Sequence, residues 1–180
     1  MNNLMLDIET FSAKPNACLV SIGACQFDIE TGKIGSKFYC NIDPWSAITY
    51  GGDVDAGTLK WWRSQSEEAR DALKGDQETL KVGLSMFAGF YNGLPKNTYV
   101  YGNGCGFDNV ILSSAYDSVG MRRPWRYNLD ADVRTIVKLG GDLLGIKVSD
   151  YKRAGTHHNA LDDALFQAKM VSDIYQRIKA

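Results

Sequence analysis

The sequence predicts an α/β domain in which a mixed five-stranded sheet, with three antiparallel strands followed by parallel strands, is flanked by helices. Three observations lead to this fold class. Residues 1–41 contain three short apolar runs separated by turns, as in an antiparallel unit. Residues 98–119 have the pattern of a strand, a glycine loop and a helix, which is typical of open α/β sheets. Residues 159–178 repeat apolar residues with the period of a long helix.

The composition is that of a globular protein, with 44% hydrophobic and 23% charged residues. A chain of 180 residues is long enough for one domain with a substantial core and short for two, so we expect a single domain, 1–180. The formal net charge of −1 excludes a protein that coats nucleic acid through bulk positive charge. A nucleic-acid partner would need a local basic patch or bound metal.

Cysteine spacing and hydropathy indicate the compartment. Cys18, Cys25, Cys40 and Cys105 lack C-x-x-C spacing and lie in or beside apolar segments, so we interpret them as small buried residues in a reducing environment. No segment approaches the roughly 20 apolar residues that a membrane helix needs, and no basic segment followed by an apolar run opens the chain. We expect a cytoplasmic protein without a membrane partner.

Two acidic residues follow the first apolar run, Leu4 to Leu6. Side chains alternate faces on a strand, so Asp7 and Glu9 project to one side while Ile8 points into the core. Ionising both acids is unfavourable unless a cation or hydrogen bonds compensate, and a hard divalent ion such as Mg²⁺ or Mn²⁺ suits them. The alternative is a frayed strand end with two solvated acids.

The next two strands are predicted at 19–28 and 34–41, followed by a long loop over 42–57. Loops of this length in compact domains tend to be functional. A helix is predicted from residue 58, with a restart at Ser66. Trp61 and Trp62 cannot both face one way on this helix. Either both cover the core from two sides, or one lines a cleft and stacks on a base.

Residues 78–94 predict an amphipathic helix that stops before Pro95. A strand at 98–102 and a glycine loop then lead into a helix at 107–119. Asp108 lies in the first turn of this helix, which places its carboxylate at the sheet edge, where open α/β sheets build their sites.

Residues 121–127 interleave arginines with aromatic residues and form the one basic and aromatic cluster in the sequence. Arg122, Arg123 and Arg126 either contact phosphates or belong to a solvated loop. Residues 127–129 are the predicted last strand. Asp130 or Asp132 would cap a helix that runs to Leu139 and ends at Gly140 and Gly141, with a connecting segment over 142–156.

The clearest helix covers residues 159–178 and carries two adjacent acids. At about 100° per residue, Asp162 falls on the solvent face and Asp163 at the margin of the apolar stripe. We therefore choose Asp163 as the functional acid. His157 and His158 lie five residues before Asp162 and Asp163 respectively, so spacing alone leaves two registers open, and the helical faces favour His158 with Asp163.

These residues resemble the motifs of the DEDDh exonucleases, the proofreading and RNase T-like branch of the RNase H-like fold. The matching segments are LDIET at 6–10, NGCGFD at 103–108 and HNALDD at 158–163. The last fits the pattern H-x-A-x-x-D of the family only with His158, Ala160 and Asp163, which agrees with the register from helix geometry.

The resemblance implies an RNase H-like sheet and a metal-dependent 3′→5′ exonuclease that releases nucleoside 5′-monophosphates. Two divalent ions, Mg²⁺ or Mn²⁺, would be held by the four acids, with Asp7 bridging them. His158 would take a proton from the attacking water. The residues expected to contact the substrate are Trp61, Trp62, Asn103, Phe107, Arg122, Arg123 and Arg126.

Residues 58–70 and 132–135 also resemble segments of phage exonuclease A and the related exonuclease VIII-like bacterial exoribonucleases, which implies a phage or prophage origin. The sequence leaves the choice between RNA and DNA open, with a lean to RNA or single-stranded 3′ tails. Many relatives form homodimers, and in such a dimer the cluster at 122–127 could serve the site of the partner.

Two alternative functions stay open. An RNase H-like endonuclease would cut circular substrates, but the H-x-A-x-x-D pattern argues against it. A catalytically weak nucleic-acid-binding module usually lacks one ligand, whereas all five positions are filled here.

Overall fold

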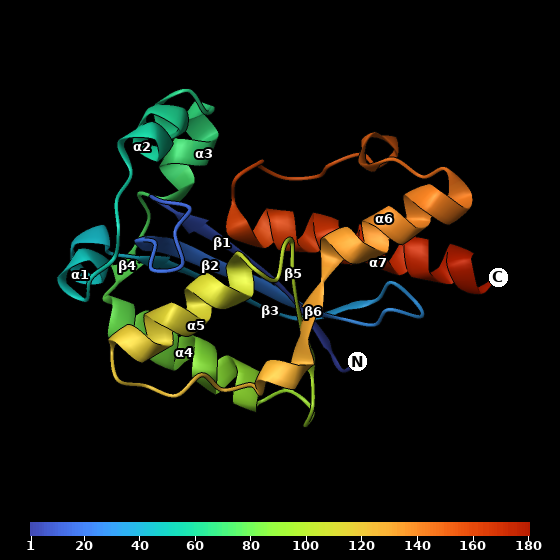
Figure 1. The fold of residues 1–180 in the computed structure, drawn as a ribbon, viewed down its shortest axis with the longest axis horizontal. Coiled ribbons are helices and arrows are strands. Elements are labelled where there is room, and N and C mark those ends of the chain that lie inside the picture. Colours follow the sequence, from blue (N-terminus) through green and yellow to red (C-terminus); the bar gives the residue numbers. More distant parts are fainter.

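A mixed six-stranded sheet forms the centre of the protein, which we describe over residues 1–180 from a computed structural model (Figure 1). The strand order is β4-β3-β2-β1-β5-β6, with β1, β2 and β3 antiparallel and β5 and β6 parallel to β1. The predicted α/β class with three antiparallel strands followed by parallel strands is confirmed. The strands are β1 (Asn3–Thr10), β2 (Leu19–Phe27), β3 (Ile34–Ile42), β4 (Gln77–Glu78), β5 (Tyr99–Gly102) and β6 (Asp130–Asp132).

Helices cover both faces of this sheet (Figure 1). Helices α4 and α5 lie on one face, α6 and α7 lie on the other, and α2 and α3 form a lobe beyond the sheet. The helices are α1 (Pro44–Thr49), α2 (Ala56–Arg63), α3 (Glu67–Ala72), α4 (Leu80–Asn92), α5 (Asp108–Ser118), α6 (Val133–Leu144) and α7 (Ala160–Lys179), with 3₁₀ turns η1 (Tyr127–Leu129) and η2 (Val148–Asp150).

The alternation of side chains along β1 divides the core into two clusters. Leu4, Leu6 and Ile8 pack in the cluster with α4 and α5, whereas Met5 packs in the cluster with α7. Because side chains on a strand alternate, Asp7 and Glu9 share the face of Met5. The two acids therefore face α7.

The structure corrects four features of the predicted fold. The sheet has a sixth strand, β4, whose two residues are too few to show an apolar pattern. Residues 127–129 form the 3₁₀ turn η1, and the last strand is β6 immediately after it. The predicted loop at 42–57 contains α1, which Asp43 caps through the amides of Trp45 and Ser46.

The fourth correction concerns the end of α6. Gly140 does not stop this helix, which continues to Leu144 and ends at Gly145 with a left-handed φ of 69°. A Cβ at Gly140 would approach the Ile174 side chain to 2.7 Å. The glycine therefore serves the close packing of α6 on α7.

Three of the four cysteines are buried, as their apolar neighbours in the sequence predict. Cys18, Cys25 and Cys40 are buried, Cys105 is half-buried, and all four are free thiols. None of the helices combines the length and the apolarity that crossing a membrane requires.

Candidate active site

The edge of β1 positions three of the four predicted acids. Strand β5 pairs with β1 only from Asn3 to Leu6, so the second half of β1 has a free edge on that side. Asp108, the first residue of α5, uses this edge, because its carboxylate accepts a hydrogen bond of 3.3 Å from the amide of Ile8. Asp108 thereby lies beside Asp7 and Glu9, and each of these two acids is only 8% exposed.

The fourth acid arrives through the close contact of α7 with β2. Gly23 of β2 pairs with Asp7, and a Cβ on this glycine would come within 2.1 Å of the backbone of Ala160. Only glycine permits the first turn of α7 to lie directly on the strand. As a result, the carboxylate oxygens of Asp7, Glu9 and Asp163 lie within 4.8 Å of one another.

Burial and like charge make this cluster electrostatically costly. Burial raises the pKa of Asp7 well above its ordinary value, and the Asp108 carboxylate raises it further. Burial, then Asp7 and Asp108, likewise raise the pKa of Glu9. Burial raises the pKa of Asp108 to about 7. A cation among these oxygens would relieve the repulsion.

The donor set fits a hard divalent cation. All the converging ligand atoms are carboxylate oxygens on buried side chains, as Mg²⁺ and Mn²⁺ prefer. Gln167 orients Asp7 through a hydrogen bond of 2.8 Å from its amide nitrogen, while its buried amide oxygen has no partner in the protein. The cluster therefore has the chemistry and the unmet polar capacity of a metal site.

His158 lies at the border of this cluster. Its amide donates to Oδ2 of Asp163 at 3.1 Å, and its backbone is left-handed, with φ of 65°. Its ring meets those of Trp61 and Trp62 edge to face, at centroid distances of 4.7 and 6.0 Å. Burial, followed by His157 and Arg153, lowers the pKa of His158 to about 4. The imidazole is therefore neutral near pH 7 and able to accept a proton.

His157 has a different environment. It is exposed, and its ring stacks on that of His158 at 3.8 Å. A nitrogen of each histidine also lies within 4.8 Å of an Asp163 oxygen. The two rings are nevertheless distinct, because His158 alone contacts both tryptophans.

The two neighbouring tryptophans differ in exposure. Trp62 is buried, and its indole N–H donates to the carbonyl of Thr10 at 2.9 Å. Trp61 is 42% exposed beside His158. Of the predicted contacts in the glycine loop, Asn103 is exposed, and Phe107 is half-buried against the core of α4 and α5. Trp61 and Asn103 thus have free surface for a substrate.

The structure does not bring the basic cluster at 121–127 to the acids. This cluster leads into β6, whose first residue, Asp130, pairs with Val100 near the start of β5. Asp108 follows the end of β5, so the basic cluster and this acid lie toward opposite ends of the strand. Arg123 contacts Asp130 at 3.4 Å, and Trp125 is buried in the core. Arg122 and Arg126 line an open depression of about 810 Å³ on the same side of the sheet as α5.

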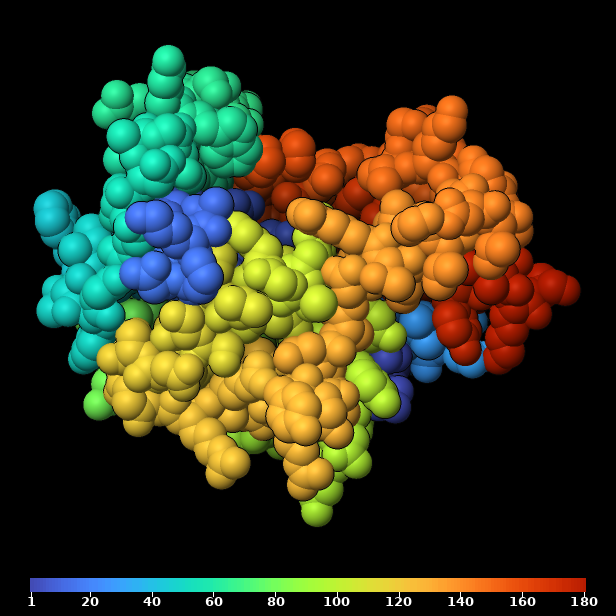
Figure 2. Space-filling view, viewed as in Figure 1, coloured from blue at the N-terminus to red at the C-terminus, as the bar shows by residue number.

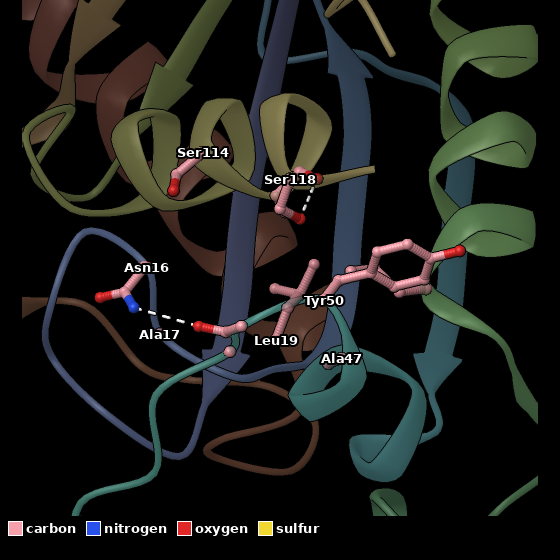
Figure 3. A pocket seen from close by; sticks show the side chains of 11 residues that line it. Asn16, Ala17, Leu19, Ala47, Tyr50, Ser114 and Ser118 are labelled. Carbon is pink, nitrogen blue, oxygen red and sulfur yellow. Dashed lines mark hydrogen bonds between the residues drawn. The ribbon is translucent and has the colours of Figure 1, made fainter. Parts of the chain in front are cut away.

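The surface of the molecule shows where a substrate could approach. In Figure 2 a hollow separates the lobe of α2 and α3 from α6, and parts of β1 and of the chain before α7 are visible in it. By contrast, the pocket between α1 and the end of α5 (Figure 3) encloses only about 20 Å³ and is lined mainly by small or apolar groups. The hollow, not this pocket, leads toward the acids.

Two residues of the site were missed in the sequence. Gln167 follows Asp163 by one helical turn and shares its face, so the helical period carried a signal for it. Arg153 makes an ion pair with Oδ1 of Asp163 from an irregular segment. No periodic pattern marks that segment, so nothing in the sequence pointed to this contact.

Comparisons with known proteins bear on the family and the fold. Residues 2–175 match the model of the family described as the 3′-5′ exoribonuclease Rv2179c-like domain. No curated protein sequence matches the chain. Among solved structures, Escherichia coli exonuclease I in complex with a dT13 oligonucleotide is similar, with a TM-score of 0.70 and 15% identity, over 98% of this chain and 41% of that one.

Two smaller proteins are similar over nearly their whole length. The nuclease domain of 3′hExo, a DEDDh family member bound to rAMP, has a TM-score of 0.68 and 13% identity, over 97% of this chain and 91% of that one. Exonuclease X in complex with 5′ overhanging duplex DNA has a TM-score of 0.62 and 14% identity, over 98% of this chain and 93% of that one. The chain thus spans about two fifths of exonuclease I but matches the full fold of compact nucleases.

Proposed function

The chain belongs to the family of Rv2179c-like 3′-5′ exoribonuclease domains, and on this premise we propose that it is a 3′-5′ exonuclease. It would hydrolyse the terminal phosphodiester bond of single-stranded or 3′-tailed RNA or DNA and release nucleoside 5′-monophosphates. The observation that carries the proposal is the convergence of buried carboxylates from β1 and α7, with Asp108 beside them. Hydrolysis of a phosphodiester by a two-metal mechanism uses such a concentration of metal ligands.

The acids would act as ligands for two divalent ions, Mg²⁺ or Mn²⁺. Asp7, Glu9 and Asp163 would hold one ion, while Asp7 and Asp108 would hold the other. When bound, the ions neutralise charge at the phosphate and lower the pKa of a bound water. Gln167 fixes the carboxylate of Asp7 for this task.

His158 would be the general base. With a pKa of about 4 it is neutral at physiological pH and has a free lone pair for the proton of the attacking water, although this pKa also makes it a weaker base than a free imidazole. Its ring is held between the tryptophans of α2 and the start of α7. Trp61 would stack on a base of the terminal nucleotides, and Asn103 and Phe107 would border the same strand.

The basic depression would contact phosphates away from the cleavage point. Arg122 and Arg126 are exposed there, and Arg123 is held by Asp130. In one molecule they would bind an upstream part of a long strand, and in a homodimer they would serve the partner. We further propose a cytoplasmic enzyme that prefers RNA or single-stranded 3′ tails, and a phage exonuclease A-like origin from residues 58–70.

Parallel digestions test the proposal. With Mn²⁺ or Mg²⁺, 5′-labelled single-stranded RNA, single-stranded DNA and tailed duplexes should shorten stepwise from the 3′ end. Circular strands should persist, and EDTA should stop the reaction. Asp7→Asn should lose activity by about a thousandfold, whereas Asp142→Asn, an exposed acid on α6, should not. Cleavage of circles would indicate an endonuclease, and binding without cleavage would indicate a non-enzymatic module.

A further inference from the structure

Arg153 makes the only ion pair with the four buried acids. Its guanidinium contacts Oδ1 of Asp163, and its Cζ lies 4.3 Å from the centre of the Phe166 ring. The Arg153 side chain is 31% exposed, whereas that of Asp163 is 8% exposed. A partly exposed positive group thus contacts a buried anionic cluster.

Apart from the contacts of the Arg153 side chain, the hydrogen bonds that hold this segment lie at its ends. We call residues 151–158 the strap. At one end, the hydroxyl of Tyr151 donates to Asp173 at 2.6 Å. At the other end, the amide of Thr156 donates to Asp162 at 2.8 Å and that of His158 donates to Asp163. Residues 152–155 make no backbone hydrogen bonds, so the middle of the strap can move without breaking any.

The two oxygens of Asp163 have separate partners. Oδ2 accepts the amide of His158, which leaves Oδ1 as the oxygen free of the backbone, and Arg153 contacts that oxygen. A cation shared with Asp7 and Glu9 needs an oxygen of Asp163, and Oδ1 is the one without a backbone hydrogen bond. A guanidinium and a divalent cation repel each other and cannot both occupy this position.

We propose that Arg153 is the exchangeable counter-ion of Asp163: it stabilises the acids in the metal-free enzyme, is displaced by the divalent cation, and then binds a phosphate of the nucleic-acid strand. The inference rests on the proposed function. A displaced guanidinium needs a new anion, and a phosphodiester offers it bidentate hydrogen bonds. Because Arg153 and His158 share the strap, metal loading would also affect the placement of the imidazole.

Metal binding without substrate provides the first test. Mn²⁺ is titrated into the full chain by calorimetry for the wild type, Arg153→Gln and Lys152→Gln. Lys152→Gln is the matched control. Lys152 is the neighbour of Arg153 and has the same charge, but unlike Arg153 it makes no ion pair. Arg153→Gln should bind Mn²⁺ about fivefold to tenfold more tightly. Lys152→Gln should change the affinity less than about twofold.

Substrate affinity provides the second test. At saturating Mn²⁺, Arg153→Gln should raise KM for a single-stranded oligonucleotide about tenfold, with a smaller effect on kcat. Arg153→Lys keeps the charge without the planar fork, so its Mn²⁺ affinity should stay near that of the wild type while KM rises. This variant also serves if Arg153→Gln fails to fold.

The outcomes separate the two proposals. If the wild type binds Mn²⁺ and degrades strands, but Arg153→Gln binds Mn²⁺ no more tightly than Lys152→Gln, the exchange of counter-ions is overturned and the proposed function stands. A wild type that binds no Mn²⁺ overturns the proposed function, and the inference with it. Tighter Mn²⁺ binding with unchanged KM overturns the phosphate half of the inference.

Discussion

The acids and the histidine of the site are held by two different kinds of structure. Asp7 and Glu9 lie in a strand that is buried along its whole length from Asn3 to Thr10, and Asp163 lies in the first turn of a 20-residue helix against that sheet. His158 instead ends the strap, has a left-handed backbone and contacts tryptophans from another lobe. The fold fixes the acids, whereas an irregular segment presents the histidine.

This difference has a physical reason. Buried carboxylates with raised pKa values remain close only if regular hydrogen-bonded elements hold them, because their repulsion favours separation. A base that serves successive nucleotides gains from adjustable placement. Substitutions of the four acids should therefore affect metal binding and stability, whereas those of His158 and of the tryptophans in α2 should affect turnover and substrate affinity.

The largest expected effect distinguishes the two histidines. His158→Asn should reduce kcat by about a hundredfold or more, because a general base typically contributes 10²- to 10⁴-fold. Asparagine tolerates the left-handed backbone at this position, so the fold should persist. His157→Asn is the matched control, and we expect less than about a threefold change. Equal losses in both variants would contradict the assignment.

The next effect concerns stability and its pH dependence. Since the pKa of Asp108 is raised to about 7 in the fold, its ionisation lowers stability as pH rises from the unfolded value near 4 to about 7. Asp108→Asn removes this penalty and retains the acceptor for Ile8. In EDTA at pH 8, the variant should be more stable than the wild type by about 1–3 kcal/mol.

Urea unfolding of both proteins from pH 4 to pH 8 measures this difference. The gap between them should be small near pH 4 and grow up to about pH 7, because only the wild type carries the ionisable group at position 108. Saturating Mn²⁺ should reverse the order, since the variant lacks a ligand. A gap that does not vary with pH would show that Asp108 ionises without cost in the fold.

A smaller effect tests the tryptophan lobe. Trp61→Ala should raise KM for single-stranded substrates about tenfold, because stacking of a base on an aromatic ring contributes about 1–3 kcal/mol. Trp45→Ala is the matched control, as this tryptophan on α1 is 77% exposed and has no contact with His158. A similar KM in both variants would assign Trp61 only to the support of the imidazole.

The smallest effect concerns the basic depression. Replacing Arg122 and Arg126 together with serine should leave the cleavage of a five-nucleotide strand within about twofold. For a strand of 30 nucleotides, the same variant should have a higher KM. The dependence of log KM on log salt concentration should also become weaker, its slope falling by about one for each lost phosphate contact. An equal loss for both strands would place the arginines at the cleavage site.

The four acids could be predicted from the sequence because local patterns determine where they lie. The period of two placed Asp7 and Glu9 on one face, and the helical period separated Asp163 from Asp162, which is half-exposed and bound to the strap. The strand, loop and helix order put Asp108 at the sheet edge. Each of these arguments needs only neighbouring residues.

The parts that sequence reasoning missed depend on contacts between distant elements. Arg153 finds Asp163 only after the strap crosses α7, and Gly140 packs on Ile174 of another helix although its residue type usually ends one. The position of 121–127 away from the acids follows from the register of β6 on β5. Such information arises only in tertiary structure.

The most direct test of the account is a crystal structure of the wild type grown with Mn²⁺ and a nucleoside 5′-monophosphate. Anomalous scattering should place Mn²⁺ among the carboxylates of Asp7, Glu9 and Asp163, with a second ion between Asp7 and Asp108, and the phosphate next to both. Manganese bound elsewhere, or an ordered nucleotide away from these four acids, would contradict the central claim.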